Sequence, residues 1–169
     1  MFEHQNASHW SVCSVVFKGN GSLNYYVKRG FVEKVTAKLL SAHGYQGDAM
    51  NLPVADVDAS AAYCVEKMGF TVVEQDTAPS EPPGSQAVKL IVLDRDGIRI
   101  GLAENGGDPE EDGCAFHTDD VQALHDEFAG AELEKLGEIK DEMRGDGSRF
   151  RVFFVVAPDG LCFWFGERV

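Results

Sequence analysis

Leu52-Pro-Val-Ala-Asp-Val-Asp-Ala59 is echoed further along the chain by Phe116-His-Thr-Asp-Asp-Val-Gln-Ala123, so that Asp56-Val57 corresponds to Asp120-Val121 at an offset of 64 residues. An Asp-Gly pair also recurs, at 96–97 and at 159–160. Each copy predicts the same elements: a short apolar strand, an Asp that caps an amphipathic helix, and alternating strands that end in a hairpin. We expect two halves around a shared groove, which would be the place for a ligand.

The length and composition predict one globular domain. The chain has 169 residues, of which 44% are hydrophobic and 10% aromatic, and this content argues against disorder. No apolar run approaches the ~20 residues of a membrane helix, and the first residues lack the pattern of a secretory signal. Four cysteines, Cys13, Cys64, Cys114 and Cys162, show no zinc-ligand spacing and are interpreted as free thiols. We therefore expect a cytoplasmic protein with no membrane partner.

The net charge of −13 marks an acidic protein and argues against nucleic acid and anionic membranes as partners. The same charge would attract cations. It is spread unevenly, because residues 1–49 carry a net charge of +2 and residues 50–169 a net charge of −15. We place a boundary near Ala49, between an N-terminal extension at 1–48 and a main domain at 49–169.

The N-terminal extension is predicted to hold one strand and one helix. Residues 10–17 read as a strand, and Val27, Phe31, Val35 and Leu39 recur at helical spacing before Gly44. Such a short segment cannot bury itself. We expect it to dock on the main domain or on a partner chain.

The main domain is predicted to hold two modules, at about 49–106 and 113–168. The first would run as a strand at 52–54, a helix at 57–68 closed by Gly69, a strand at 70–74, a loop at 77–86, and a hairpin of strands 87–94 and 98–103. That hairpin would place Asp94 opposite Arg99 and Val92 opposite Gly101. The second would run as a strand at 114–118, a helix at 121–130, a loosely defined strand within 133–143, and strands at 150–156 and 161–165.

Four stretches in this order resemble the vicinal oxygen chelate superfamily, which includes glyoxalase I, extradiol dioxygenases and bleomycin-resistance proteins. They lie at 52–70, 96–102, 115–124 and 157–160. The resemblance implies an α+β fold in which two βαβββ modules form a cup-shaped mixed sheet with helices on the convex face. Many members of the family dimerise with the cups shared between chains, so it also implies a homodimer.

The family's metal positions can be followed residue by residue. They fall on Ala49 and Gly113 in the first strands of the modules and on Gly101 and Trp164 in the last strands. None of these side chains can bind a divalent metal ion. The chain therefore resembles the metal-free, bleomycin-resistance-like branch, for which we expect no metal, no other cofactor and no catalytic residue.

Strand alternation predicts which side chains face the cup. If Trp164 faces it, Cys162, Ala115 and His117 do so as well, while Phe163, Phe165, Cys114 and Phe116 pack under the helices. The first hairpin would add Val92 and Arg99, and Phe154 is the better choice on the penultimate strand. The predicted ligand-binding residues are Trp164, Phe154, His117, Val92, Arg99 and Cys162.

Each of these residues also has a plainer interpretation. Trp164 either stacks on a ligand or only fills the cup. His117 is a polar anchor, a general base or a structural residue, and Arg99 is expected to pair with Asp94 rather than with a ligand. Cys162 is interpreted as a packed thiol. The acidic loop at 104–113 is either a solvated loop or the rim of the groove.

The sequence thus predicts a metal-independent binding protein that sequesters an aromatic or hydrophobic small molecule, with a cationic ligand favoured by the acidic charge. An alternative is a metal-dependent lyase, isomerase or dioxygenase of the same superfamily, with His117 and Glu104 as the first candidate ligands. A third alternative is an interaction module whose N-terminal segment binds a partner.

Overall fold

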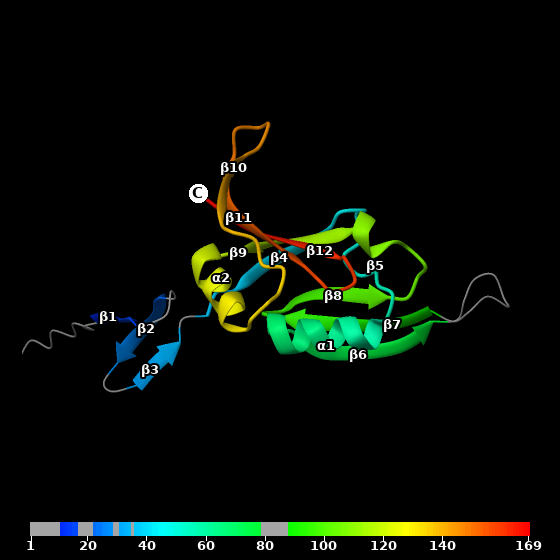
Figure 1. The fold of residues 1–169 in the computed structure, drawn as a ribbon, viewed down its shortest axis with the longest axis horizontal. Coiled ribbons are helices and arrows are strands. Elements are labelled where there is room, and N and C mark those ends of the chain that lie inside the picture. Colours follow the sequence, from blue (N-terminus) through cyan, green and yellow to red (C-terminus); the bar gives the residue numbers. More distant parts are fainter. Residues whose placement is uncertain (1–10, 17–21, 29–30, 35, 79–87) are drawn as a thin grey trace, which may run out of the picture. The chain divides into compact units, whose positions relative to one another are not determined.

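The structure, a computed structural model, describes residues 11–16, 22–28, 31–34, 36–78 and 88–169. The chain divides into two compact units, Met1–Thr36 and Ala37–Val169 (Figure 1). Neither of the described helices, of 12 and 10 residues, is long and apolar enough to cross a membrane.

The first unit contains a three-stranded antiparallel sheet of β1 (Ser11–Val16), β2 (Ser22–Lys28) and β3 (Phe31–Lys34) in that order. The strand predicted at 10–17 is confirmed. The helix predicted from Val27 to Leu39 is wrong, because the described residues of that segment lie in strands, at 27–28, 31–34 and 39, or in irregular structure at 36–38. A spacing of four residues is even, so it fits one face of a strand as well as one face of a helix, and the β-branched valines favour the strand.

The boundary between the units lies earlier than the change in charge near Ala49 indicates. Strand β4 (Leu39–Gly44) belongs to the second unit, where it pairs with β9 (Gly113–Thr118) in antiparallel fashion. This pairing joins residues that are far apart in the sequence. Composition reports only local charge and carries no information about it.

Helix α1 (Val57–Met68) has the bounds that the sequence predicts. The Asp56 side chain caps it by accepting a hydrogen bond from Ala59 N at 3.0 Å, and Gly69 ends it in the left-handed conformation at φ 72°. The Glu104 carboxylate accepts a further hydrogen bond from Val57 N at 3.1 Å. An acidic side chain at this position also suits the helix dipole.

The first module forms a four-stranded mixed sheet in the order β5 (Leu52–Pro53), β8 (Ile98–Ala103), β7 (Val88–Arg95) and β6 (Thr71–Ala78). The hairpin register is confirmed, with Asp94 opposite Arg99 and Val92 opposite Gly101. Both turn residues, Asp96 and Gly97, have positive φ, as a tight hairpin requires. Strand β6 extends to Ala78, past the predicted start of the loop, and the rest of that loop lies outside the described residues.

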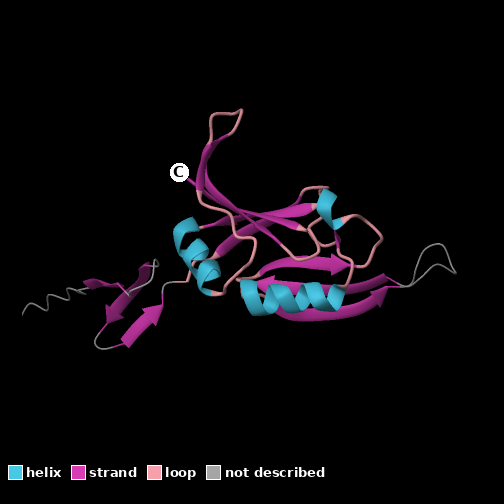
Figure 2. Ribbon diagram, in the orientation of Figure 1, coloured by secondary structure: helices cyan, strands magenta, loops and turns pink. Residues whose placement is uncertain are grey.

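The second module repeats the plan. Helix α2 (Val121–Gly130) is capped by Asp120, which accepts from Ala123 N at 2.9 Å. The sheet has five strands in the order β10 (Lys140–Met143), β11 (Arg149–Val156), β12 (Cys162–Arg168), β9 and β4. A short 3-10 helix, η1 (Pro109–Glu111), lies between the modules in the chain. Figure 2 shows both helices against the strands of the second unit, and the α+β class with mixed sheets is confirmed.

The two modules share one hydrophobic core. Phe116 lies at its centre, with its ring stacked on Phe165 at 5.1 Å and tilted against Phe70 of the first module at 5.8 Å. Phe153 and Phe163 are also fully buried in this core. Because Phe116, Phe163 and Phe165 all lie on the helix side, the predicted strand parity is confirmed.

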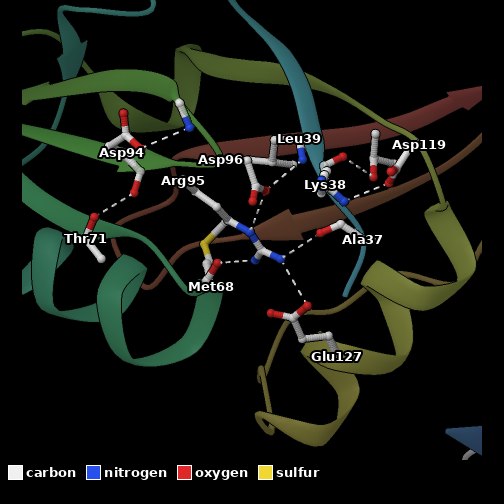
Figure 3. Close-up of polar contacts among 12 residues, drawn as sticks. Ala37, Lys38, Leu39, Met68, Thr71, Asp94, Arg95, Asp96, Asp119 and Glu127 are labelled. Carbon is white, nitrogen blue, oxygen red and sulfur yellow. Dashed lines mark hydrogen bonds and ion pairs between the residues drawn. The ribbon is translucent and has the colours of Figure 1, made fainter. Parts of the chain in front are cut away.

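A buried arginine also ties the modules together (Figure 3). Arg95 is 7% exposed, and its guanidinium donates to Met68 O at the end of α1, to Ala37 O, and to Glu127 of α2 at 3.0 Å. The neighbouring Asp96 carboxylate accepts from Leu39 N at 2.9 Å. Buried charge is stable only when it is paired and hydrogen-bonded, so this set fixes both helix ends against the start of β4.

Candidate functional site

The two sides of the five-stranded sheet differ. Helix α2 covers one side, where Phe153, Val155, Phe163 and Phe165 are fully buried. Alternate residues lie on the other side, and no described helix packs there. We call this side the Trp164 face; it carries His43, Tyr45, Ala115, His117, Glu142, Phe150, Val152, Phe154, Cys162 and Trp164.

Trp164 lies at the centre of this face, on β12. The indole is 5% exposed and packs with Phe150, at 5.9 Å between ring centroids, and with His117, at 5.4 Å. Its Nε1 donates to the Glu142 carboxylate at 3.5 Å. The ring lies over Gly166, where a Cβ would overlap it. Glycine at this position therefore lets the indole lie flat along its own strand.

Arg144 covers the two aromatic rings. Its Cζ lies 4.5 Å from the centroid of Phe150 and 5.1 Å from that of Trp164, within the range of cation–π contacts. The residue sits where β10 turns into β11, and its backbone exchanges hydrogen bonds with Ser148 O and Gly147 N, both at 2.9 Å. The Asp146 carboxylate accepts from Ser148 N and Oγ, which lowers the pKa of Asp146. The turn thus holds Arg144 in place.

Two histidines lie side by side on this face. The rings of His43 on β4 and His117 on β9 are 6.1 Å apart and edge-on. Burial lowers the pKa of His117, and the charges of Arg144 and His43 lower it further. His117 is therefore a neutral imidazole at neutral pH, with one nitrogen to donate and one to accept.

Tyr45 and Cys162 lie at one end of the face. The Tyr45 ring lies against Gly113, and its hydroxyl interacts electrostatically with the Cys162 side chain. Burial raises the pKa of the Cys162 thiol and of the Tyr45 hydroxyl. A protonated thiol is a poor nucleophile, so Cys162 is suited to packing rather than to covalent chemistry.

The positions expected for a metal in this fold do not fit one. Gly101 has no room for a side chain, because a Cβ there would overlap the backbone of Met50. A Cβ on Gly113 would overlap the carbonyl of Cys162 and the Tyr45 ring. Trp164 offers no ligand atom, and no group of three or more His, Cys, Asp or Glu within the described ranges is arranged to hold a metal ion.

The structure brings together four of the six predicted ligand-binding residues. Trp164, Phe154, His117 and Cys162 share the Trp164 face, and Phe154 is 40% exposed there, directly opposite Trp164 on β11. Val92 and Arg99 belong to the other sheet instead. Arg99 pairs with Asp94 at 3.4 Å, so the prediction of that ion pair is confirmed.

Three acidic side chains of the loop at 104–113 are used within the fold. Glu104 caps α1, Asp108 accepts from Glu110 N at 2.9 Å, and Asp112 accepts from Gly113 N at 2.7 Å.

Two cavities of about 420 and 320 Å³ lie away from the Trp164 face, one beside Asp58 and Lys89, the other beside Tyr63 and Lys135. Neither includes Trp164, so a groove with the loop at its rim stays a prediction.

Sequence reasoning missed four residues of this face, Glu142 among them, and also Arg144, which lies over it. His43 and Tyr45 lay in a segment assigned to the N-terminal extension, and only the pairing of β4 with β9 brings them here. Phe150 has the same parity as Val152 and Phe154, so alternation along β11 could have found it. No sequence signal pointed to Arg144, because its place depends on how a hairpin folds back over the sheet.

The chain belongs to the Glyoxalase/Bleomycin resistance protein/Dioxygenase superfamily, whose family model matches residues 47–165. The resemblance to the vicinal oxygen chelate superfamily that the sequence indicated is therefore confirmed. No curated protein sequence is significantly similar to the chain.

Solved structures show the same fold at low identity. A bleomycin resistance determinant encoded on transposon Tn5 has a TM-score of 0.52 and 21% identity, covering 70% of this chain and 93% of its own. TnmS3, an antibiotic-binding protein from Streptomyces sp. CB03234, has a TM-score of 0.55 and 18% identity, with coverages of 71% and 93%. A bleomycin-binding protein complexed with bleomycin has a TM-score of 0.51 and 21% identity, with coverages of 70% and 95%.

Proposed function

We propose that this protein is a metal-independent small-molecule binding protein that sequesters an aromatic or hydrophobic ligand on the Trp164 face. The observation that carries this proposal is the aromatic cluster of Trp164, Phe150 and His117, with the exposed Phe154 opposite Trp164, on a sheet face where no described helix packs. Aromatic side chains on a sheet bury flat apolar ligands with little loss of side-chain freedom.

The chemistry of the face supports binding rather than catalysis. Burial raises the pKa of the Cys162 thiol, so the thiol stays protonated at neutral pH. The His117 ring packs against Trp164, Phe150 and His43, and among the described residues no hydrogen bond or ion pair joins it to a carboxylate that would orient it as a general base. The poor fit of metal at Gly101, Gly113 and Trp164 supports independence from metal.

The names of the structural relatives point the same way. Two of them are a bleomycin resistance determinant and a protein complexed with bleomycin, and a third is an antibiotic-binding protein. Sequestration of a toxic small molecule requires only a groove of matching shape and charge. A resistance-like role therefore fits a face without catalytic groups.

We also propose a homodimer in the cytoplasm. Phe154 and Tyr45 are exposed apolar groups on the Trp164 face, and a second chain placed over it would bury them and close the site. Cys64, Cys114 and Cys162 are free, which suits a reducing compartment. Light scattering at micromolar concentration would test the assembly, and a monomer would contradict it.

A binding measurement with the neutral probe 2-naphthamide tests the central proposal. Phe154→Ala removes an exposed ring from the Trp164 face and should weaken binding by about five- to thirtyfold. Met143→Ala is the matched control, since Met143 is 75% exposed on the opposite side of the same sheet. Equal effects of the two variants, or stoichiometric metal in protein purified without chelator, would contradict the proposal.

A further inference from the structure

The charges around Trp164 differ in sign from the charge of the whole chain. The chain has 28 acidic and 15 basic residues. Lys140 lies opposite Val152, Arg168 lies opposite Phe150, and Arg144 lies over the rings, so three bases share this end of the face. The acids there are Glu142, bonded to the Trp164 indole, and Asp146, bonded to Ser148.

These three bases also lack the ion pairs that bases of the first module make. Lys89 pairs with Asp58 at 3.3 Å, Arg99 with Asp94 at 3.4 Å, and Arg95 with Glu127 at 3.0 Å. No carboxylate in the described part of the chain forms an ion pair with Arg144, Arg168 or Lys140. Arg168 does interact with the charge of Asp146, which helps to lower the pKa of that carboxyl, but it makes no close ion pair. In so acidic a chain, the guanidinium of Arg144 and the ammonium of Lys140 are left available for a partner from outside.

We infer that the Trp164 face takes a flat aromatic anion, with Arg144 as the residue that recognises the negative group. The inference rests on the function proposed above and names the charge of the ligand. A guanidinium that lies over an aromatic ring uses its face for that contact and keeps its in-plane N–H donors for an oxyanion. Arg168 and Lys140 add charge of the same sign nearby.

A cationic ligand fits this face poorly, although the net charge favours one at long range. The cation–π surface of Trp164 and Phe150 is already in contact with Arg144. A ligand cation would have to displace that guanidinium and then lie close to Arg168 and Lys140. Like charges brought together at a binding surface weaken binding. Local charge therefore decides the ligand class here, because distant charges are screened by salt.

Three probes of one shape test the inference: 2-naphthoate, 2-naphthamide and 2-naphthylmethylammonium, measured by calorimetry with the full chain. We expect the carboxylate to bind about tenfold more tightly than the ammonium, with the amide between them. Arg144→Gln should weaken naphthoate binding about tenfold, and Arg168→Gln should weaken it less. Arg149→Gln is the matched control, because it removes the same charge from the opposite side of β11.

The outcomes separate this inference from the proposed function. If 2-naphthylmethylammonium or 2-naphthamide binds as tightly as 2-naphthoate, the inference is wrong and the proposed binding function stands. If Arg144→Gln leaves naphthoate binding unchanged or tightens it, Arg144 only covers the indole and the inference is again wrong. If none of the three probes binds, the proposed function fails and the inference fails with it.

Discussion

The two modules share a plan but differ at equivalent positions, and the difference separates scaffold from site. Both contain an Asp-capped helix after their first strand, and both place an apolar sheet face in the common core. In the first sheet, the backbone of Met50 lies against Gly101, and Arg99 is paired with Asp94. In the second, Trp164 and its aromatic neighbours lie on a face with unpaired bases. The plan common to both modules thus builds the fold, and the difference between the two sheets creates a candidate site on one of them.

The largest expected effect concerns the two sides of the second sheet. Phe116→Ala should lower the free energy of unfolding by about 3–5 kcal/mol, because it leaves a cavity at the centre of the core that both modules share. Phe154→Ala on the exposed side should cost under about 1.5 kcal/mol. Urea denaturation compares the two. Similar losses would mean that Phe154 is packed as tightly as Phe116.

The next effect concerns the residue that precedes the Asp-Gly turn, because this residue differs between the two modules. Arg95 precedes Asp96-Gly97 in the first module, whereas Pro158 precedes Asp159-Gly160 in the second. Arg95→Met should destabilise the protein by about 3 kcal/mol, because Glu127 loses its buried partner and two backbone carbonyls lose donors. Arg99→Met, which removes an exposed ion pair, should cost under about 1 kcal/mol. Equal unfolding midpoints for the two variants would show that the buried hydrogen bonds of Arg95 between the modules do not stabilise the fold.

Each sheet has a glycine whose replacement by alanine would crowd a neighbouring group. A Cβ at Gly166 would overlap the Trp164 indole, and a Cβ at Gly101 would overlap the backbone of Met50. Gly166→Ala and Gly101→Ala should each cost about 1–3 kcal/mol through overpacking.

Only Gly166→Ala should also weaken 2-naphthamide binding and change the near-ultraviolet circular dichroism of the tryptophan. A loss of binding in Gly101→Ala of the same size would instead place the ligand on both sheets.

The smallest effect is a dependence of stability on pH through His117, which has no titrating counterpart in the first module. His117 has Pro53 as its counterpart in the repeat, so the first module has no titrating group there. The pKa of His117 is lowered in the folded state, so the unfolded chain binds the proton more readily. Stability from this residue is complete above about pH 6.5, the ordinary value for histidine, and is lost as the pH falls from there towards the folded pKa.

His117→Gln should therefore flatten the fall in unfolding midpoint between about pH 7 and 5. The same protonation adds positive charge to the Trp164 face, so 2-naphthoate should bind more tightly at the acidic end of that range while stability falls. A variant with an unchanged pH profile would show that His117 titrates as it does in water.

The sequence by itself determined the parts of this protein that depend on neighbours along the chain. The bounds of α1 and α2 follow from Asp56, Asp120 and Gly69, because capping is a contact over three or four residues. The hairpin register follows from the Asp96-Gly97 turn, and the separation of Trp164 from Phe163 and Phe165 follows from the alternation of side chains along a strand. Each of these is fixed by local backbone geometry.

Only the tertiary structure decided which distant segments meet. The spacing of Val27 and Phe31 fits both a helix and a strand, and cross-strand pairing in the first unit selects the strand. Strand β4 brings His43 to His117, the β10–β11 turn brings Arg144 over Trp164, and Arg95 reaches Glu127 across the modules. These contacts join residues from separate elements, and their free energy depends on burial and charge in the folded chain, which no local pattern records.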